Sequence, residues 1–421
     1  MNKKKISIVG GGFSGCISAF LLSKLGYKVT LFEKGDKLGG TSSDILYDKE
    51  FFFNGPHYFF PNTKWVKEIT KYKEFKNEFA NYICYDSKKL KEFNFHGSYT
   101  DIFDKIEFNN FFAHPVTSKP FKDISDKEKK LTLYERIKSY QNNIALSLEN
   151  WLTKNSLDSK KLHFNCAELL NIGRVCFIND LNKIKNLKQK NKYADYILGI
   201  PKHKNDLERK ICLPKNGNNT FYKKFYSLLS KSIKIEFNSK IRIQSNNKTK
   251  IEILNKDNYV ESDFIIWAAN PVYILKDLGY GILDNPVVKV KLYCAEINLL
   301  NKSNLENFYI QVFTNKSNIF RVYFYKTKNK YKITVETFFD KNEKSINEAE
   351  LKKILNNLKL EFKIKGKFIE KKEVRHYLMT CKDFNQFIKF DNDFKNTNLI
   401  NGGWHLFGRE NKIEHIMKNF Y

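Results

Sequence analysis

The chain has 421 residues, 42% of them hydrophobic, which is enough for two or three domains with a sizeable core. It contains no apolar run of about 18 residues, and its basic N-terminus lacks the apolar segment of a signal peptide, so we expect no transmembrane helix and a cytoplasmic protein. The net charge is +28, but only seven of the 74 basic residues are Arg and the lysines are dispersed along the chain. This distribution argues against a nucleic-acid partner. A general attraction for anionic substrates, such as phosphorylated sugars, remains an open alternative.

The first forty residues predict a dinucleotide-binding unit. An apolar strand over residues 5–9 runs into a glycine turn, apolar residues at helical spacing follow over 13–25, and a second strand covers 29–32. An acidic residue, Glu33, stands at the end of that strand, 23 residues after Gly10. Strand, glycine turn, helix, strand and acid in this order are typical of the dinucleotide-binding fold.

Each residue type in this unit has a physical reason. Gly10 permits a tight turn, Gly12 lets a diphosphate approach bare backbone, and Gly15 lets helix and strand pack closely. The first helical amides, which include those of Phe13 and Ser14, would face the diphosphate, and Glu33 would accept hydrogen bonds from ribose hydroxyls. The alternative, a plain glycine turn, does not account for the acid at this distance.

The next residues distinguish FAD from NAD as the cofactor. Residues 34–41 contain a second glycine pair, Gly39 and Gly40, flanked by Lys34 and Thr41. This pattern resembles the FAD-binding superfamily of amine oxidases, protoporphyrinogen oxidase, phytoene desaturases and UDP-galactopyranose mutase. In that superfamily the second pair contacts the FAD diphosphate, so the resemblance implies FAD.

Residues 54–62 resemble a segment of UDP-galactopyranose mutase that reads Gly-Pro-His, an apolar residue, Phe and His. The resemblance implies that His57 contacts the flavin, although the second histidine of the mutase is replaced here by Phe60. The alternative interpretation is a histidine whose hydrogen bonds are satisfied by backbone beside a turn.

The following 150 residues match this superfamily weakly. We predict a helix over 65–79, two strands around a turn over 82–93 and a helix over 131–151. The mutase's Lys-Gln-Trp segment is absent. Arg174 could bind a phosphate group of the substrate, or it could be an exposed arginine at a helix end.

A second group of superfamily-like segments begins at residue 213. A Pro-Lys-Asn-Gly turn precedes a predicted helix over 221–232, and Ile241 matches a position whose backbone pairs with the adenine in the superfamily. A hairpin is expected over 250–262. A buried strand then ends at Ala268, Ala269 and Pro271, where the resemblance implies a crossing between domains, with Ala269 at the cofactor.

Strands are predicted from residue 286 to 339, and a helix over 350–362. Amine oxidases carry a lysine in the matching strand that holds a water near flavin N5; Lys289 matches it best and Lys291 is the alternative. Either could instead be a lysine that protects an edge strand from aggregation. Arg375, in a strand over 374–377, is a further candidate for substrate binding.

The C-terminal segment completes the resemblance. A strand over 398–401 leads to Gly402 and Gly403, and a last helix begins near Ile413. In the superfamily the N-terminus of this helix faces the flavin pyrimidine, where its dipole would stabilise negative charge on the reduced ring. Gly403 replaces the usual Asp, although mutases also have two glycines here.

The seven cysteines are scattered, with no CxxC pair and no histidine cluster, which favours reduced thiols and no metal site. We therefore predict an α/β protein with a Rossmann-like FAD-binding domain in three pieces (1–60, 211–271 and 396–421). An inserted α+β substrate domain with an antiparallel sheet would comprise 61–210 and 272–395. The resemblance implies an FAD-dependent oxidoreductase that transfers hydride from a small-molecule substrate to flavin N5. The alternatives are a mutase acting on a nucleotide sugar and a non-catalytic scaffold like Rab GDP-dissociation inhibitors.

Overall fold

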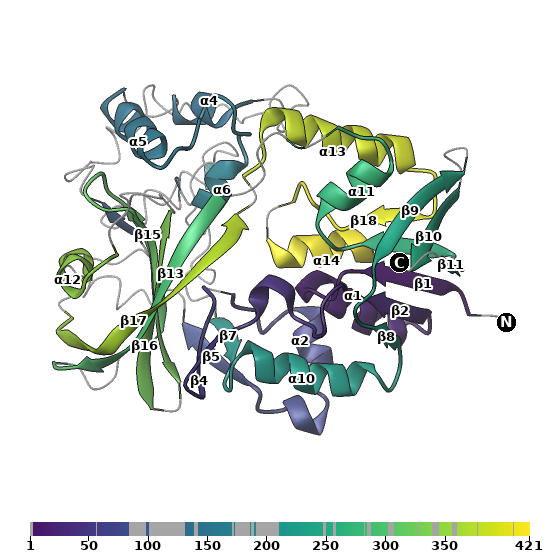
Figure 1. Ribbon diagram of the computed structural model, residues 1–421, viewed down its shortest axis with the longest axis horizontal. Coiled ribbons are helices and arrows are strands. Elements are labelled where there is room, and N and C mark those ends of the chain that lie inside the picture. Colours follow the sequence, from purple (N-terminus) through teal and green to yellow (C-terminus); the bar gives the residue numbers. More distant parts are fainter. Residues whose placement is uncertain are drawn as a thin grey trace.

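The structure is a computed structural model of the whole chain (Figure 1). It has two parts. One is built around a parallel sheet and contains both ends of the described chain, and the other is built around a mainly antiparallel sheet. The described residues are 3–55, 57–83, 98–100, 131–138, 142–170, 172, 186, 189–190, 210–246, 250–255, 258–281, 283, 288–301, 307–327, 329–338, 345–355, 360–376, 378–406 and 408–421.

The parallel sheet has five strands in the order β18-β12-β1-β2-β8, so the first strand of the chain lies at its centre. Its members come from three separated parts of the sequence. Both faces are covered, which explains why β12 is apolar throughout and why four of the five residues of β1 are buried. The strands are β1 (Lys5–Val9), β2 (Lys28–Phe32), β8 (Lys234–Glu236), β12 (Phe264–Trp267) and β18 (Leu399–Asn401).

Alternate strand residues enter two different cores. Ile6 and Ile8 pack with helices α1 (Phe13–Lys24), α2 (Lys64–Ile69), α10 (Asn218–Leu229) and α14 (Arg409–Met417). Ile265 and Trp267 pack on the other face with α11 (Pro271–Asp277) and α13 (Cys381–Phe394). This period of two places helices on both faces of the sheet, which is the predicted Rossmann-like α/β arrangement.

The second part is a six-stranded sheet in the order β17-β13-β16-β15-β14-β6, antiparallel except for the pairing of β6 with β14. Helix α12 (Glu348–Leu355) packs on one face. The hairpin of β3 (Ile45–Tyr47) and β4 (Glu50–Phe52) packs elsewhere on the sheet. The strands are β6 (Ser98–Thr100), β13 (Val288–Leu299), β14 (Phe308–Phe313), β15 (Ile319–Thr327), β16 (Lys330–Phe338) and β17 (Phe362–His376).

Smaller elements complete the described chain. The predicted hairpin over 250–262 is confirmed by the antiparallel pairing within a three-stranded sheet. These strands are β9 (Ile241–Asn246), β10 (Lys250–Asn255) and β11 (Asn258–Val260). The remaining helices are η1 (Gly40–Ser42), η2 (Lys73–Phe75), α4 (Leu133–Ile137), α5 (Asn142–Lys154) and α6 (Cys166–Leu170).

Three predictions of local structure were wrong. The helix over 65–79 ends at Ile69, because Phe79 already belongs to β5 (Phe79–Ile83), whose partner is the distant β7 (Lys210–Pro214). Strand pairing here overrides the helical spacing of the apolar residues. The helix over 131–151 is divided into α4 and α5. The long strand β17 begins at Phe362, where the sequence predicted the end of a helix; residues 84–93 of the predicted strand pair lie outside the described residues.

Candidate cofactor site

The first glycine turn lies at the carboxyl end of β1, where open α/β sheets bind their ligands. Two of its glycines are required by packing within the protein. A Cβ on Gly10, whose φ is +109°, would lie 2.8 Å from the backbone nitrogen of Ala269. A Cβ on Gly15 would lie 2.0 Å from the carbonyl oxygen of Gly10. These contacts bring the start of α1 and the end of β12 against the turn.

Gly12 differs from both, because a Cβ there would meet no atom within 4 Å. It is the N-cap of α1, its backbone is extended, and no side chain caps the helix. The first amides of a helix need an acceptor and carry partial positive charge. An anionic group therefore fits in the open space before Gly12.

The second glycine pair packs directly on the first turn. Gly39 donates its backbone N–H to the carbonyl of Gly11 at 2.9 Å, and it forms a parallel bridge with Gly12. A Cβ on Gly40 would lie 3.3 Å from the Cα of Gly12. Gly39 and Gly40 have φ values of +115° and +53°, a region that favours glycine. The second turn thus packs closely against the first, and a Cβ on Gly39 would also lie 2.8 Å from the Tyr222 ring, so Gly12 keeps the open space.

Glu33 binds two backbone amides beside this space. Its Oε2 accepts from the N–H of Gly11 at 2.6 Å, and its Oε1 accepts from that of Gly35 at 2.8 Å. The backbone of Glu33 also accepts from Ser239, two residues before Ile241, at 3.0 Å. The predicted ribose-binding acid and the predicted adenine-binding position are therefore close in the structure.

The predicted C-terminal residues reach the same edge of the sheet. A Cβ on Gly402 would lie 2.6 Å from the carbonyl oxygen of Trp267, so this glycine packs on the end of β12. Gly403 donates its N–H to Asn401 Oδ1 at 2.7 Å. Ile413 is buried in α14, within the same core as Phe13. The last helix begins at Arg409, four residues before the predicted start.

His57 contacts Arg409, the first residue of α14, through its Nδ1. The Arg409 guanidinium also lies 5.1 Å from the centroid of the Phe13 ring, at the start of α1. Because an arginine remains protonated, this contact requires Nδ1 to act as an acceptor in a neutral ring. The sequence analysis missed Arg409, although a scarce arginine after Gly408 at a helix start was a usable signal.

A second cation lies one turn further along α14. Burial lowers the pKa of Lys412, and the positive charge of Arg409 lowers that pKa further. The N-cap of this helix, Gly408, provides no side-chain cap. One acidic residue, Glu410, also lies in this first turn, where it accepts from Trp65 Nε1 at 3.1 Å. Two cations against one carboxylate at an uncapped helix N-terminus leave a positive region that suits an anionic ligand.

Asp44 is a buried carboxyl group that the sequence analysis also missed. Burial raises its pKa to about 7. Its Oδ2 accepts from the backbone N–H of Asn219 at 2.9 Å, and its Oδ1 accepts from Asn218 Nδ2 at 3.1 Å. It thereby caps α10, whose N-cap is Gly217. This helix start is already occupied by a side-chain carboxyl group, in contrast to those of α1 and α14.

The remaining predicted cofactor residues lie around the turn. Ser14 is half-buried in the first turn of α1, and Thr41 is exposed but accepts a hydrogen bond from Asn54 Nδ2 at 3.2 Å. Lys34 is exposed, with its ammonium 5.2 Å from the centroid of the Tyr273 ring.

The predicted catalytic lysine and substrate-binding arginines are not brought to this site by the described contacts. Lys289 is exposed on β13, which is an internal strand rather than an edge. Lys291 forms an ion pair with Glu370 at 2.6 Å. Arg174 lies outside the described residues, and Arg375 lies in β17 with a side chain outside the described part of the structure.

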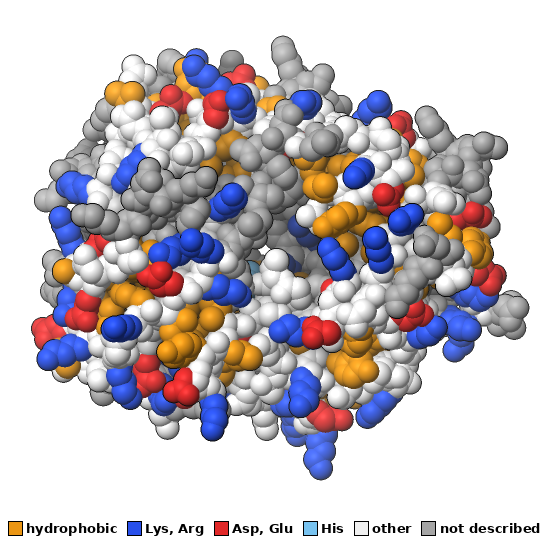
Figure 2. All heavy atoms as spheres, viewed as in Figure 1, with side chains coloured by type: hydrophobic (Ala, Val, Ile, Leu, Met, Phe, Trp, Pro, Cys, Tyr) orange, Lys and Arg blue, Asp and Glu red, His pale blue; other side chains and the backbone are white. Residues whose placement is uncertain are grey.

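Figure 2 shows a hollow near the centre of one face, between the two parts of the molecule, with Lys and Arg side chains on both sides. None of the helices in the described ranges combines the length and apolar character that crossing a bilayer requires. In those ranges, no three His, Cys, Asp or Glu side chains gather as a metal site would require.

Comparison with known proteins supports the N-terminal unit most strongly. Residues 8–72 match the family model of an NAD(P)-binding Rossmann-like domain. The chain is 64% identical over 36 residues to 4,4'-diapolycopen-4-al dehydrogenase of Metabacillus indicus, which is 9% of this chain and 7% of that protein. It is 39% identical over 69 residues to a probable UDP-galactopyranose mutase of Klebsiella pneumoniae, which is 16% of this chain and 18% of that protein. The matched segments therefore span less than a fifth of either relative.

Solved structures match over the full chain. A putative protoporphyrinogen oxidase from Exiguobacterium sp. 255-15 aligns with a TM-score of 0.60 and 12% identity, covering 100% of this chain and 98% of the other. Reduced UDP-galactopyranose mutase aligns with a TM-score of 0.62 and 14% identity, covering 99% and 95%. These matches confirm the predicted fold, a Rossmann-like domain joined to a second part with an antiparallel sheet.

Proposed function

We propose that the chain binds FAD and is an FAD-dependent oxidoreductase, with the cofactor's diphosphate before the first turn of α1. The observation that carries this proposal is the open space at Gly12, bordered by Gly39 and Gly40. A diphosphate would accept hydrogen bonds from the uncapped backbone amides of α1. A second glycine turn beside the first suits FAD better than NAD. The adenosine ribose would bind beside Glu33.

The flavin end would lie toward Gly402, Gly403 and the start of α14. Arg409 and Lys412 would favour negative charge there, together with the helix dipole. Bound flavin would supply hydride acceptance at N5, while the chain orients the substrate and limits access of water. We also propose the division into a three-piece FAD domain and an inserted substrate domain, because the parallel sheet draws strands from all three pieces.

A mutase-like activity on a nucleotide sugar is the second candidate. It is favoured by the contact of His57 with Arg409, since His57 belongs to the mutase-like segment, and by the match of 69 residues to a probable mutase. The positive net charge of +28 suits an anionic substrate in either case. A scaffold without flavin is disfavoured, because it would not need both glycine turns.

Anaerobic spectroscopy of the purified, FAD-loaded chain separates these candidates. A flavin bleached by an amine or an alkene would support the oxidoreductase. A spectrum that responds to UDP-sugars only after reduction by dithionite would support the mutase. A chain that retains no flavin after incubation with FAD would contradict both and leave the scaffold.

A further inference from the structure

We infer that Lys332 is a positioning residue that fixes residues 50–59, the bridging segment, to the six-stranded sheet and so holds this segment against the cofactor site. Pro56 of this segment lies outside the described residues. The inference rests on the proposed function in one respect, namely that the group positioned by this segment is FAD. The contacts of Lys332 themselves lie within the chain.

One end of the bridging segment touches the glycine turns. Asn54 Nδ2 donates to the carbonyl of Thr41, which directly follows the second glycine pair, at 3.2 Å. The Phe59 ring stacks on that of Phe13, with centroids 5.1 Å apart and planes at 10°. His57 contacts Arg409 between these two points in the sequence. A displacement of this segment would therefore displace groups beside the proposed flavin.

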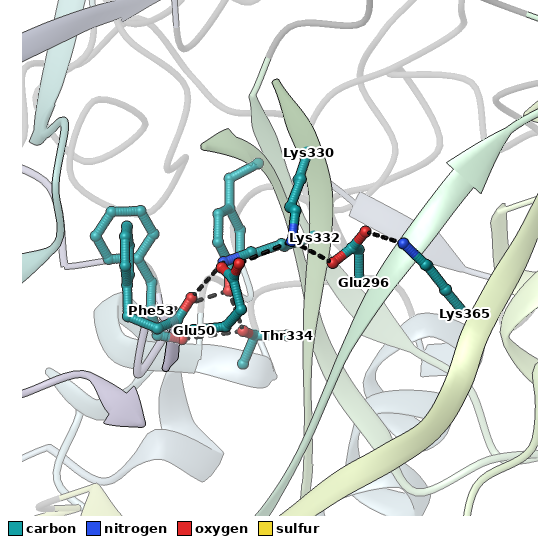
Figure 3. Close-up of polar contacts among 9 residues, drawn as sticks. Glu50, Phe53, Glu296, Lys330, Lys332, Thr334 and Lys365 are labelled. Carbon is teal, nitrogen blue, oxygen red and sulfur yellow. Dashed lines mark hydrogen bonds and ion pairs between the residues drawn. The ribbon is translucent and has the colours of Figure 1, made fainter. Parts of the chain in front are cut away.

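The other end is bound by Lys332 on β16 (Figure 3). The Lys332 ammonium donates to Glu50 Oε2 at 2.7 Å and to the carbonyl of Phe51 at 2.8 Å. It also lies 4.7 Å from the centroid of the Phe51 ring and 4.8 Å from that of Phe52. One side chain of the sheet thus contacts three consecutive residues of the bridging segment.

Thr334 continues this contact from the same face of β16, two residues further along. Its hydroxyl donates to the carbonyl of Phe53 at 2.9 Å, and the Tyr325 hydroxyl accepts from the N–H of Phe53 at 3.0 Å. Both backbone groups of Phe53 are therefore bound by the sheet. Phe53 directly precedes Asn54. These hydrogen bonds therefore fix Asn54 relative to the sheet, and Asn54 in turn binds the carbonyl of Thr41.

Lys332 and Lys330 share one carboxylate but differ in burial. Lys332 is fully buried, whereas the Lys330 side chain is 40% exposed and binds Glu50 Oε1 at 2.7 Å. Lys330 also reaches Glu296, which binds Lys365 in turn (Figure 3). Exposed ion pairs contribute little, while a buried charge needs its partners. Lys330 is therefore a matched control for Lys332.

Hydrogen exchange of the flavin-free chain tests whether Lys332 holds the bridging segment. In Lys332→Met, the amides of residues 50–55 and 57–59 should exchange at least about tenfold faster, because an opening that costs about 1.4 kcal/mol less is ten times more populated. In Lys330→Met the exchange should stay within about twofold of the wild type. Equal exchange in the two variants would overturn the inference.

Titration with FAD tests whether this segment positions the cofactor. Lys332→Met should raise the FAD dissociation constant at least about tenfold and shift the visible bands of the flavin at saturation, whereas Lys330→Met should do neither. A purely structural role of Lys332 would lower the melting temperature and leave the bands unchanged, which would overturn the inference. Lys332→Arg, which keeps the charge, should restore both values toward the wild type.

Thr334→Val keeps the test decisive if Lys332→Met does not fold. This variant loses only the hydroxyl that binds Phe53, so it should accelerate exchange over residues 50–59 and shift the flavin bands in the same direction. Unchanged exchange and unchanged bands in Thr334→Val would overturn the inference. If the wild type binds no FAD, the proposed function fails, while the exchange rates still decide whether Lys332 holds the bridging segment.

Discussion

Gly39 donates its backbone N–H to the carbonyl oxygen of Gly11 at 2.9 Å, so the second glycine turn of the chain lies directly against the first. This contact joins segments that precede and follow β2. It places Gly39 and Gly40 beside Gly11 and Gly12 at the start of α1, where the helix amides lack a side-chain cap. The proposed FAD site depends on that arrangement.

Substitutions of Gly12 and Gly15 should separate cofactor binding from folding. In Gly12→Val the side chain enters open space, so the melting temperature of the flavin-free chain should stay near that of the wild type while FAD retention is lost. Gly15→Val should lower stability by about 1–3 kcal/mol or more, because its Cβ would lie 2.0 Å from a carbonyl oxygen. Thermal melts and flavin content measure both effects. Normal flavin content in Gly12→Val would contradict the placement of the diphosphate.

Arg409 should contribute to FAD affinity. Removal of a charged hydrogen-bond donor costs about 1.5–3 kcal/mol, so Arg409→Gln should weaken FAD binding roughly ten- to a hundredfold. Lys418→Gln removes the same charge from the exposed C-terminal end of α14 and serves as the control. Isothermal titration with FAD gives both constants. Equal losses in the two variants would indicate that only net charge matters.

Asp44 should make stability depend on pH between about 4 and 7. Burial raises its pKa in the folded state to about 7, so the folded chain binds a proton that the unfolded chain has released. Its contribution to stability is therefore present below pH 4 and is lost as the pH rises through 7. In Asp44→Asn this contribution is absent at every pH. The free energy of unfolding of Asp44→Asn minus that of the wild type should therefore increase as the pH rises from 4 to 7. A constant difference from pH 4 to 8 would refute the assignment.

Glu50 should make the stability of the fold decrease as the pH falls, in contrast to Asp44, whose contribution is lost as the pH rises. Hydrogen bonds from Lys330 and Lys332 hold its pKa at about 2 in the folded state. Its contribution to stability is therefore present above its ordinary pKa of 4.5 and is lost as the pH falls toward 2. Urea melts of wild type and Glu50→Gln should differ most near pH 6 and converge near pH 2. Curves that stay parallel would contradict the pairing.

The glycine positions were predictable because each follows from a local requirement. A tight turn, a close helix and a bare helix start each demand glycine within a few residues of a strand end. The same holds for Glu33, which the order of elements places at the next strand end. These features need no knowledge of the distant parts of the chain.

The contacts of His57 and Lys332 could not be predicted, because their partners are distant in sequence. Arg409 lies 352 residues after His57, and Lys332 lies 282 residues after Glu50. Only tertiary packing, of β4 against β16 and of the bridging segment against the start of α14, brings these pairs together. For the same reason, the sequence pattern indicated Lys289 in β13, which is exposed. A fully buried lysine, Lys332, lies instead on the neighbouring strand β16.

Helix α13 is a case in which the signal was present and was not used. Phe384, Phe387, Phe390 and Phe394 recur at helical spacing and are all buried. Thr380 and Asp383 form a capping box at the start of this helix. Both features are local, so this helix could have been predicted from the sequence.

Native mass spectrometry of the freshly purified chain, before and after incubation with FAD, shows whether the chain binds this cofactor. The wild type should gain the mass of one FAD per chain, and Gly12→Val, folded as judged by its thermal melt, should gain none. A wild-type chain that remains at its apo mass in excess FAD would contradict the proposal that a diphosphate cofactor binds before α1.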